Sequence, residues 1–85
     1  MKFEELKQEV AKLGLTARQF PARTVIFDKS GFVVMSVWTD FSRVVESDYP
    51  NWNKLPNKIQ RRLIKLTEDY VSWLESSKRR FREVK

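Results

Sequence analysis

The last third of the chain constrains the fold most, because its apolar residues recur at helical intervals of three and four. Six of them fall within an arc of about 100° when successive residues are turned by 100°. They are Ile59, Leu63, Leu66, Tyr70, Trp73 and Leu74. The spacing predicts a long amphipathic helix that starts near Pro56, since proline suits the first helical turn. Ile64 and Val71 would widen its apolar side to pack against a sheet and a second helix.

Cations gather on the opposite side of the same predicted helix. Lys58, Arg61, Arg62, Lys65, Arg79 and Arg80 fall within another arc of about 100°, and Asp69 is the only acid among them. The net charge of the chain is +6, and residues 57–85 hold nine bases and four acids. A local basic excess favours contact with nucleic acid, an acidic protein surface or anionic lipid. It serves equally well to keep a small domain soluble.

The predicted helix is also longer than the domain that could cover it. An 85-residue chain forms one domain, with a radius of gyration near 12 Å and a diameter of roughly 30 Å. A helix over residues 57–85 would be about 43 Å long at 1.5 Å per residue. We therefore expect a compact domain over residues 1–77 and a basic helical extension or frayed tail over residues 78–85.

Phe81 and Val84 lie in that tail and continue the apolar side of the helix. Two interpretations stay open. In the first, the tail frays, because chain termini are poorly ordered unless something holds them. In the second, the two side chains dock on a second copy or on a foreign partner, and the flanking arginines supply charge at the rim of the interface.

The first 56 residues predict a helix followed by antiparallel strands. Phe3, Leu6, Val10 and Leu13 have helical spacing, which indicates a helix over residues 2–13. Gly14 follows where a left-handed C-terminal cap is expected. Branched and aromatic residues at 24–27 and 32–39 predict two strands.

The segment between these strands, Asp28-Lys29-Ser30-Gly31, is typical of a hairpin turn with a glycine bulge. Residues 15–20 predict a short edge strand and residues 41–46 a further strand. The expected fold class is thus α+β, with an N-terminal helix, an antiparallel sheet of three or four strands, and a long C-terminal helix packed on one face of that sheet.

The other face of the sheet is less constrained by the sequence. Phe32, Val34 and Trp38 could line a partly open patch there. In the loop that follows, Tyr49 and Trp52 favour a role in closing one end of the core over a role in binding.

Composition excludes several kinds of chemistry. The chain has no His and no Cys, which excludes His-based triads, thiolate nucleophiles and zinc sites with nitrogen or sulfur ligands. Its two glycines cannot form a phosphate-binding loop or a dinucleotide fingerprint. Asp40, Glu46 and Asp48 could in principle hold Mg²⁺, but their spacing is typical of ordinary turns. We expect no enzyme activity, no metal and no cofactor.

The N-terminus has acids where a signal peptide needs an apolar run. The longest apolar stretch, Phe32–Trp38, is far shorter than the ~20 residues of a membrane span. We therefore expect a soluble cytoplasmic protein with no membrane partner.

Nucleic-acid binding is one candidate function. The order helix, three strands, helix is that of double-stranded-RNA-binding domains, whose second helix presents lysines to phosphates. Lys58, Arg61, Arg62 and Lys65 would act as counterparts in that role. The tight turn at residues 28–31 differs from such domains, because it has no His to reach into a groove.

A second resemblance covers about residues 3–75. It is carried by "LKQEVAKLGL", the pair Val37-Trp38, Asp48-Tyr49, Leu55-Pro56 and the run "RRLIKLTEDY". With these motifs the chain resembles short proteins carried by phages and prophages of Gram-positive bacteria. Those begin with a helix ending in Leu-Gly and close on a helix with Leu-x-x-Leu-x-x-x-Tyr, where this chain has Leu63, Leu66 and Tyr70. The resemblance implies a phage context and no established activity or site residues.

Together these features predict a small non-enzymatic interaction module, a phage or prophage accessory protein acting on a host or phage macromolecule. The candidate surface consists of the basic side of the last helix and its extension, that is Lys58, Arg61, Arg62, Lys65, Arg79, Arg80, Phe81 and Val84. The partner would be an unidentified protein or a second copy bound through this helix. The alternative is a nucleic-acid-binding accessory protein that uses the same basic side.

Overall fold

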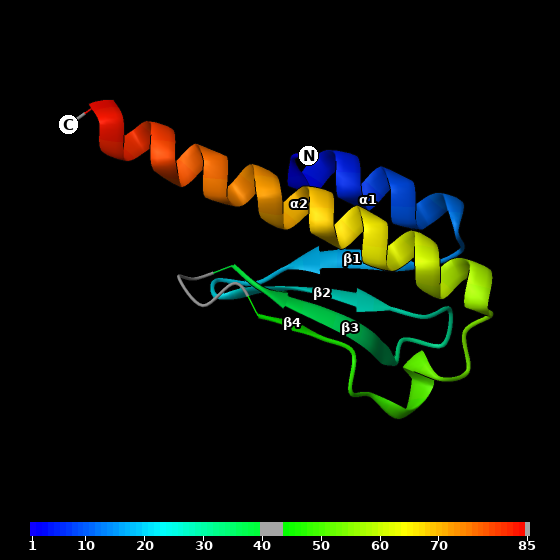
Figure 1. The fold of residues 1–85 in the computed structure, drawn as a ribbon. Coiled ribbons are helices and arrows are strands. Elements are labelled where there is room, and N and C mark those ends of the chain that lie inside the picture. The colour runs from blue at the N-terminus through cyan, green and yellow to red at the C-terminus, as the bar shows by residue number, and fades with distance from the viewer. Residues whose placement is uncertain (40–43, 85) are drawn as a thin grey trace.

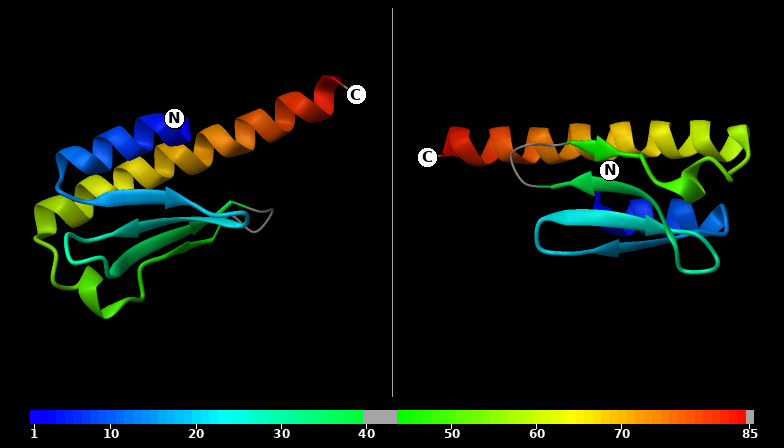
Figure 2. Two further views of the ribbon diagram at one scale, coloured as in Figure 1. Left: turned by 180° about the vertical axis from the view of Figure 1, so that it is seen from behind. Right: turned by 90° about the horizontal axis from the view of Figure 1, so that it is seen from below.

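The computed structural model describes the backbone of residues 1–39 and 44–84 and the side chains of residues 1–39 and 44–76. The elements are α1 (Phe3–Lys12), β1 (Thr16–Gln19), β2 (Arg23–Phe27), β3 (Val33–Trp38), β4 (Val45–Glu46), the short 3₁₀ helix η1 (Pro50–Trp52) and α2 (Asn57–Val84). The strands form one antiparallel sheet in chain order, and both helices lie on one face of it (Figures 1 and 2). The predicted α+β fold is confirmed.

The end of α1 is fixed by the glycine that the sequence predicted as its cap. Gly14 has a φ of +80°, a left-handed conformation that glycine adopts without steric cost. The N–H of Leu15 donates to the carbonyl of Val10, and the N–H of Gly14 donates to that of Ala11. This pair of bonds is a Schellman motif. It turns the chain so that Leu15 enters the core next to β1.

The hairpin between β2 and β3 also forms at the predicted turn. The Asp28 carboxylate accepts hydrogen bonds from the backbone N–H groups of Ser30, at 2.9 Å, and Phe32, at 3.0 Å. The side-chain amide of Asn51 donates to its other oxygen at 2.9 Å. These bonds lower the pKa of Asp28, with the Phe32 N–H contributing most and Asn51 next. Gly31 closes the turn with a φ of +88°.

The core lies between the sheet and the two helices. Its buried members are Leu6, Val10, Leu15, Ala17, Ile26, Val34, Met35, Val37, Leu63, Leu66 and Tyr70. Ala17, Ile26 and Met35 are cross-strand neighbours on β1, β2 and β3. The hydroxyls of Tyr70 and Thr24 share a buried hydrogen bond of 3.0 Å, so α2 is joined to the sheet by a polar contact as well as by apolar packing.

The face of the sheet opposite the helices differs from the sequence-based expectation. Val34 is buried, not part of an open patch, and it lies where the register between β2 and β3 shifts at Ile26 and Phe27. Trp38 is half-buried: the Arg23 guanidinium lies 5.5 Å from its ring centre, and its indole N–H donates to the Glu46 carboxylate. Of the three predicted patch residues only Phe32 is well exposed, at 61%.

The segment around η1 covers part of this face. The Tyr49 hydroxyl bonds to Ser36 of β3 at 3.0 Å, and Trp52 packs against the core. The predicted packing of Trp52 against the core is thus confirmed, and Tyr49 is joined to the sheet through its hydroxyl. The strand predicted over residues 41–46 is seen only as the two residues of β4, and residues 40–43 lie outside the described part.

The helix α2 is continuous from Asn57 to Val84 and extends past α1 and the sheet (Figure 1). The molecule measures 45 × 20 × 19 Å along its principal axes, so its long dimension is close to the ~42 Å length of a 28-residue helix. The backbone of α2 thus projects beyond the sheet and α1, as the length of the helix predicted. The boundary proposed at residues 77 and 78 stays a prediction.

Candidate binding surface on α2

The local sequence of α2 gives it two chemically different sides. Leu63, Leu66 and Tyr70 are fully buried against the sheet, and Ile59, Trp73 and Leu74 pack at the edge of the core. The helix begins directly after Pro56, whose carbonyl accepts from the N–H groups of Ile59 and Gln60. The packing of the apolar side fixes the rotation of the helix, so the residues between these positions must face outward.

Four of the predicted site residues lie together on the outward side. Lys58, Arg61, Arg62 and Lys65 are all exposed on the first three turns of α2, and we call these four residues the cationic surface. The predicted participants Arg79, Arg80, Phe81 and Val84 follow on the same helix, but their side chains lie outside the described part. The structure therefore brings the first four together and says nothing of how the other four are placed.

One member of the cationic surface is held by an acid on the other helix. The Arg62 guanidinium donates to the Glu9 carboxylate at 3.0 Å, and Lys12 donates to the same carboxylate at 2.8 Å. The hydrogen bonds from Lys12 and then from Arg62 lower the pKa of Glu9. Arg62 therefore joins α2 to α1 in addition to contributing charge.

The other three cations have no acidic partner within the part of the chain whose side chains are described. Among the side chains of residues 1–39 and 44–76, the ion pairs present both end on Glu9. Lys58, Arg61 and Lys65 are consequently free of ion pairs within that part of the chain. Exposed and unpaired, they give this end of α2 a positive potential that is not neutralised locally.

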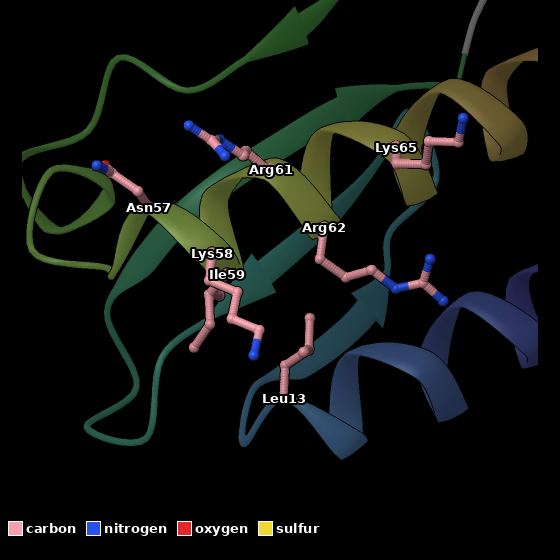
Figure 3. A pocket seen from close by; sticks show the side chains of 7 residues that line it. All are labelled: Leu13, Asn57, Lys58, Ile59, Arg61, Arg62 and Lys65. Carbon is pink, nitrogen blue, oxygen red and sulfur yellow. The ribbon is translucent and has the colours of Figure 1, made fainter.

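An open groove of about 810 Å³ lies beside these cations. Its lining consists of Asn57, the four residues of the cationic surface, and two aliphatic side chains, Leu13 and Ile59. Figure 3 shows Leu13 projecting from the end of α1 toward α2, with Lys58 and Arg62 extending to the same side. Arg61 and Lys65 point away from α1. The groove thus combines an aliphatic floor with a cationic rim.

The sequence predicted the rim of this groove and not its floor. Ile59 was expected in the core, and it is half-buried with part of its surface lining the groove. Leu13 was expected as the last apolar residue of the first helix. Its position facing α2 depends on how α1 packs beside that helix, a contact between distant segments that no local pattern in the sequence encodes.

Ile64 is a further departure from the prediction. It is 45% exposed and does not widen the apolar side of α2. The reason is that α1 packs along the opposite flank of α2, where Glu9 meets Arg62. Val71, on the same side as Ile64, is half-buried and packs against the core as expected.

Of the three carboxylates considered for a metal site, the structure describes Glu46 and Asp48. Glu46 accepts the hydrogen bond from the Trp38 indole, and Asp40 lies outside the described residues. Within residues 1–39 and 44–84, no cluster of three or more acids has a geometry that could bind a metal ion.

Comparisons with protein-family models, curated proteins and solved structures found no match to this chain. Over the described residues, no helix combines the length and the apolar character needed to cross a membrane.

Proposed function

We propose that this chain is a small non-enzymatic interaction module that binds a protein partner through the cationic surface of α2. In the context that the phage resemblance implies, it is an accessory protein acting on a host or phage macromolecule in the cytoplasm. The observation that carries this proposal is the division of α2 into two sides. Leu63, Leu66 and Tyr70 pack the helix against the sheet, whereas Lys58, Arg61 and Lys65 are exposed beside a groove and make no ion pair within residues 1–39 and 44–76.

The last turns of α2 extend the proposed surface. They carry Arg79 and Arg80 and also Phe81 and Val84, which continue the apolar spacing of the helix in the sequence. A helix that projects beyond its own domain offers these residues to another molecule. A second copy is a less suitable occupant than a foreign partner, because two tails with a net positive charge repel each other when they lie side by side.

A tagged pull-down from a lysate of the source cell, with and without nuclease, tests the proposal. A protein partner is expected to remain bound after nuclease treatment and to be lost from the variant Arg61→Glu, Arg62→Glu. Deletion of residues 78–85 should weaken retention of the protein partner without changing the oligomeric state measured by light scattering. Retention by the charge-reversed variant at the wild-type level would overturn the proposal.

Nucleic-acid binding is the second candidate, and the same four cations on one exposed helix favour it. Both helices also lie on one face of an antiparallel sheet, as the predicted resemblance to double-stranded-RNA-binding domains requires. The sheet has a fourth strand, however, and Asp28 of the hairpin turn brings a negative charge toward any phosphate. Binding of this type would weaken steeply as salt rises, and nuclease treatment would remove the bound material.

A further inference from the structure

The groove beside the cationic surface has two chemical parts that a single ligand would have to satisfy. Its floor is made by Leu13 and Ile59, which are both half-buried and both aliphatic. Its rim is made by cations, and no acid lines the groove among the side chains of residues 1–39 and 44–76. A ligand that brings only negative charge would leave the aliphatic floor in water. A ligand that brings only apolar groups would leave the charge of the rim without a partner.

We infer that this groove binds an acidic peptide segment that inserts an aliphatic side chain between Leu13 and Ile59. This inference rests on the proposed function and specifies the chemistry of the partner. In Figure 3, Lys58 and Arg62 flank the space in front of Leu13 on the α1 side, whereas Arg61 and Lys65 lie across the helix. A peptide that crosses α2 would place its carboxylates near both pairs of cations. Its aliphatic side chain would then lie over Leu13 and Ile59.

The charge of the rim favours a carboxylate-rich ligand because Lys58, Arg61 and Lys65 are not neutralised within the described part of the chain. Arg62 is held in place by Glu9. It therefore presents its remaining N–H groups from a fixed position, and less side-chain freedom is lost when a ligand binds. Complementary charges at a rim of this kind mainly raise the rate of association and set specificity.

The floor favours a peptide over a nucleic acid. Proteins that bind single strands hold the bases on aromatic side chains, and no aromatic residue lines the groove in the part of the chain whose side chains are described. A duplex presents phosphates and sugars, which gain little from contact with Leu13 and Ile59. Burying one aliphatic side chain of a peptide on such a floor contributes about a tenfold to hundredfold tightening of the Kd.

Selection from a random 16-residue peptide library displayed on phage tests the inference even while the cellular partner is unidentified. The full-length chain serves as bait, and the selected peptides are synthesised with a fluorescent label for anisotropy measurements. We expect them to be enriched in Asp and Glu around one Leu, Ile, Val or Met. Replacing that aliphatic residue by Ser should weaken the Kd about tenfold or more. Selection of peptides without acidic excess, or of none, would overturn the inference.

Two protein variants and a matched control test whether the peptide binds in the groove. Lys58→Glu reverses a charge at the rim, and Leu13→Gln replaces one of the two aliphatic side chains of the floor by a polar one; each should weaken binding about tenfold. If Leu13→Gln lowers the thermal midpoint, Lys58→Glu alone decides, because Lys58 is exposed. Lys7→Glu on α1 makes the same change of charge at an exposed position outside the groove, and it should leave the Kd within about twofold.

The outcomes separate this inference from the proposed function. A protein partner that survives nuclease treatment and depends on Arg61, together with selected peptides that ignore Leu13 and Lys58, would refute the groove and leave the interaction module standing. Duplex or single-stranded RNA that competes more strongly than the selected peptides at moderate salt would refute both.

Discussion

The two sides of α2 are built from the same backbone and differ in what they contact. Leu63, Leu66 and Tyr70 face the sheet and lose essentially all solvent exposure, whereas Lys58, Arg61 and Lys65 face outward. A side that is buried is constrained by packing, and substitutions there change stability. Residues on the exposed side that make no ion pair within the described part of the chain are not constrained by packing. Substitutions there should change binding and leave the stability of the fold nearly unchanged. The predictions below test this division, starting with the largest expected effect.

The largest effect is expected from Leu66→Ala on the buried side. Leu66 is 1% exposed and packs in the centre of the core. Removing its side chain leaves a cavity that a closely packed interior fills only in part, and the free energy of unfolding should fall by about 2–5 kcal/mol. Urea denaturation followed by tryptophan fluorescence measures this. A loss below about 1 kcal/mol would show that α2 is not held by this side.

Tyr70→Phe should have the next largest effect. It removes only the hydroxyl that bonds to Thr24 at 3.0 Å, and it leaves the Thr24 hydroxyl buried without that partner. We expect a loss of about 1–3 kcal/mol in the free energy of unfolding. The double variant with Thr24→Val should recover part of this loss, since both polar groups are then absent. Equal stability of Tyr70→Phe and wild type would contradict the contact.

Arg62→Ala should have a smaller effect that depends on pH, because Arg62 lies where the two sides meet. Hydrogen bonds from Lys12 and Arg62 put the pKa of Glu9 below its ordinary value of 4.5. A carboxylate with a depressed folded-state pKa stabilises the fold above its unfolded pKa, and this contribution is lost as the pH falls through the folded value. The stability difference between Arg62→Ala and wild type should therefore be present at neutral pH and vanish in acid. Chemical denaturation at a series of pH values measures it, and a difference that grows in acid would contradict the ion pair.

The smallest effect on stability is expected from Arg61→Glu combined with Lys65→Glu. Neither side chain makes an ion pair within the described part of the chain, so the free energy of unfolding should change by less than about 0.5 kcal/mol. The matched control is Lys7→Glu with Arg18→Glu, which makes the same change of charge at exposed positions on α1 and β1. A loss of more than about 1 kcal/mol in the first variant alone would mean that this side supports folding.

The sequence predicted the parts of the fold that depend on local chemistry. The Schellman turn at Gly14, the hairpin at Asp28–Gly31 and the burial of the apolar residues Leu63, Leu66 and Tyr70 follow from spacing and from glycine. The prediction failed at Val34 and Ile64, where the outcome depends on contacts between distant segments. A register shift opposite Ile26 and Phe27 breaks the alternation around Val34, and the flank on which α1 packs decides the exposure of Ile64.

The candidate site likewise has one part that could be predicted from the sequence and one part that could not. Lys58, Arg61, Arg62 and Lys65 could be assigned to one side of a helix from the sequence, because helical periodicity fixes which residues share a face. The groove could not be predicted, since it requires α1 to pack beside α2 so that Leu13 faces that helix. The ion pair between Glu9 and Arg62 joins residues 53 positions apart, and periodicity does not encode such a distance.

The central claim is that the cationic side of α2 is the binding surface. Site-specific photocrosslinking tests this claim most directly. A photoreactive amino acid is placed at position 61 of α2 in one protein and at position 7 of α1 in another, and both are irradiated in lysate. We predict a protein adduct from position 61 that resists nuclease digestion, and none at comparable yield from position 7. Equal adducts from both positions, or an adduct from position 61 that disappears with nuclease, would contradict the account.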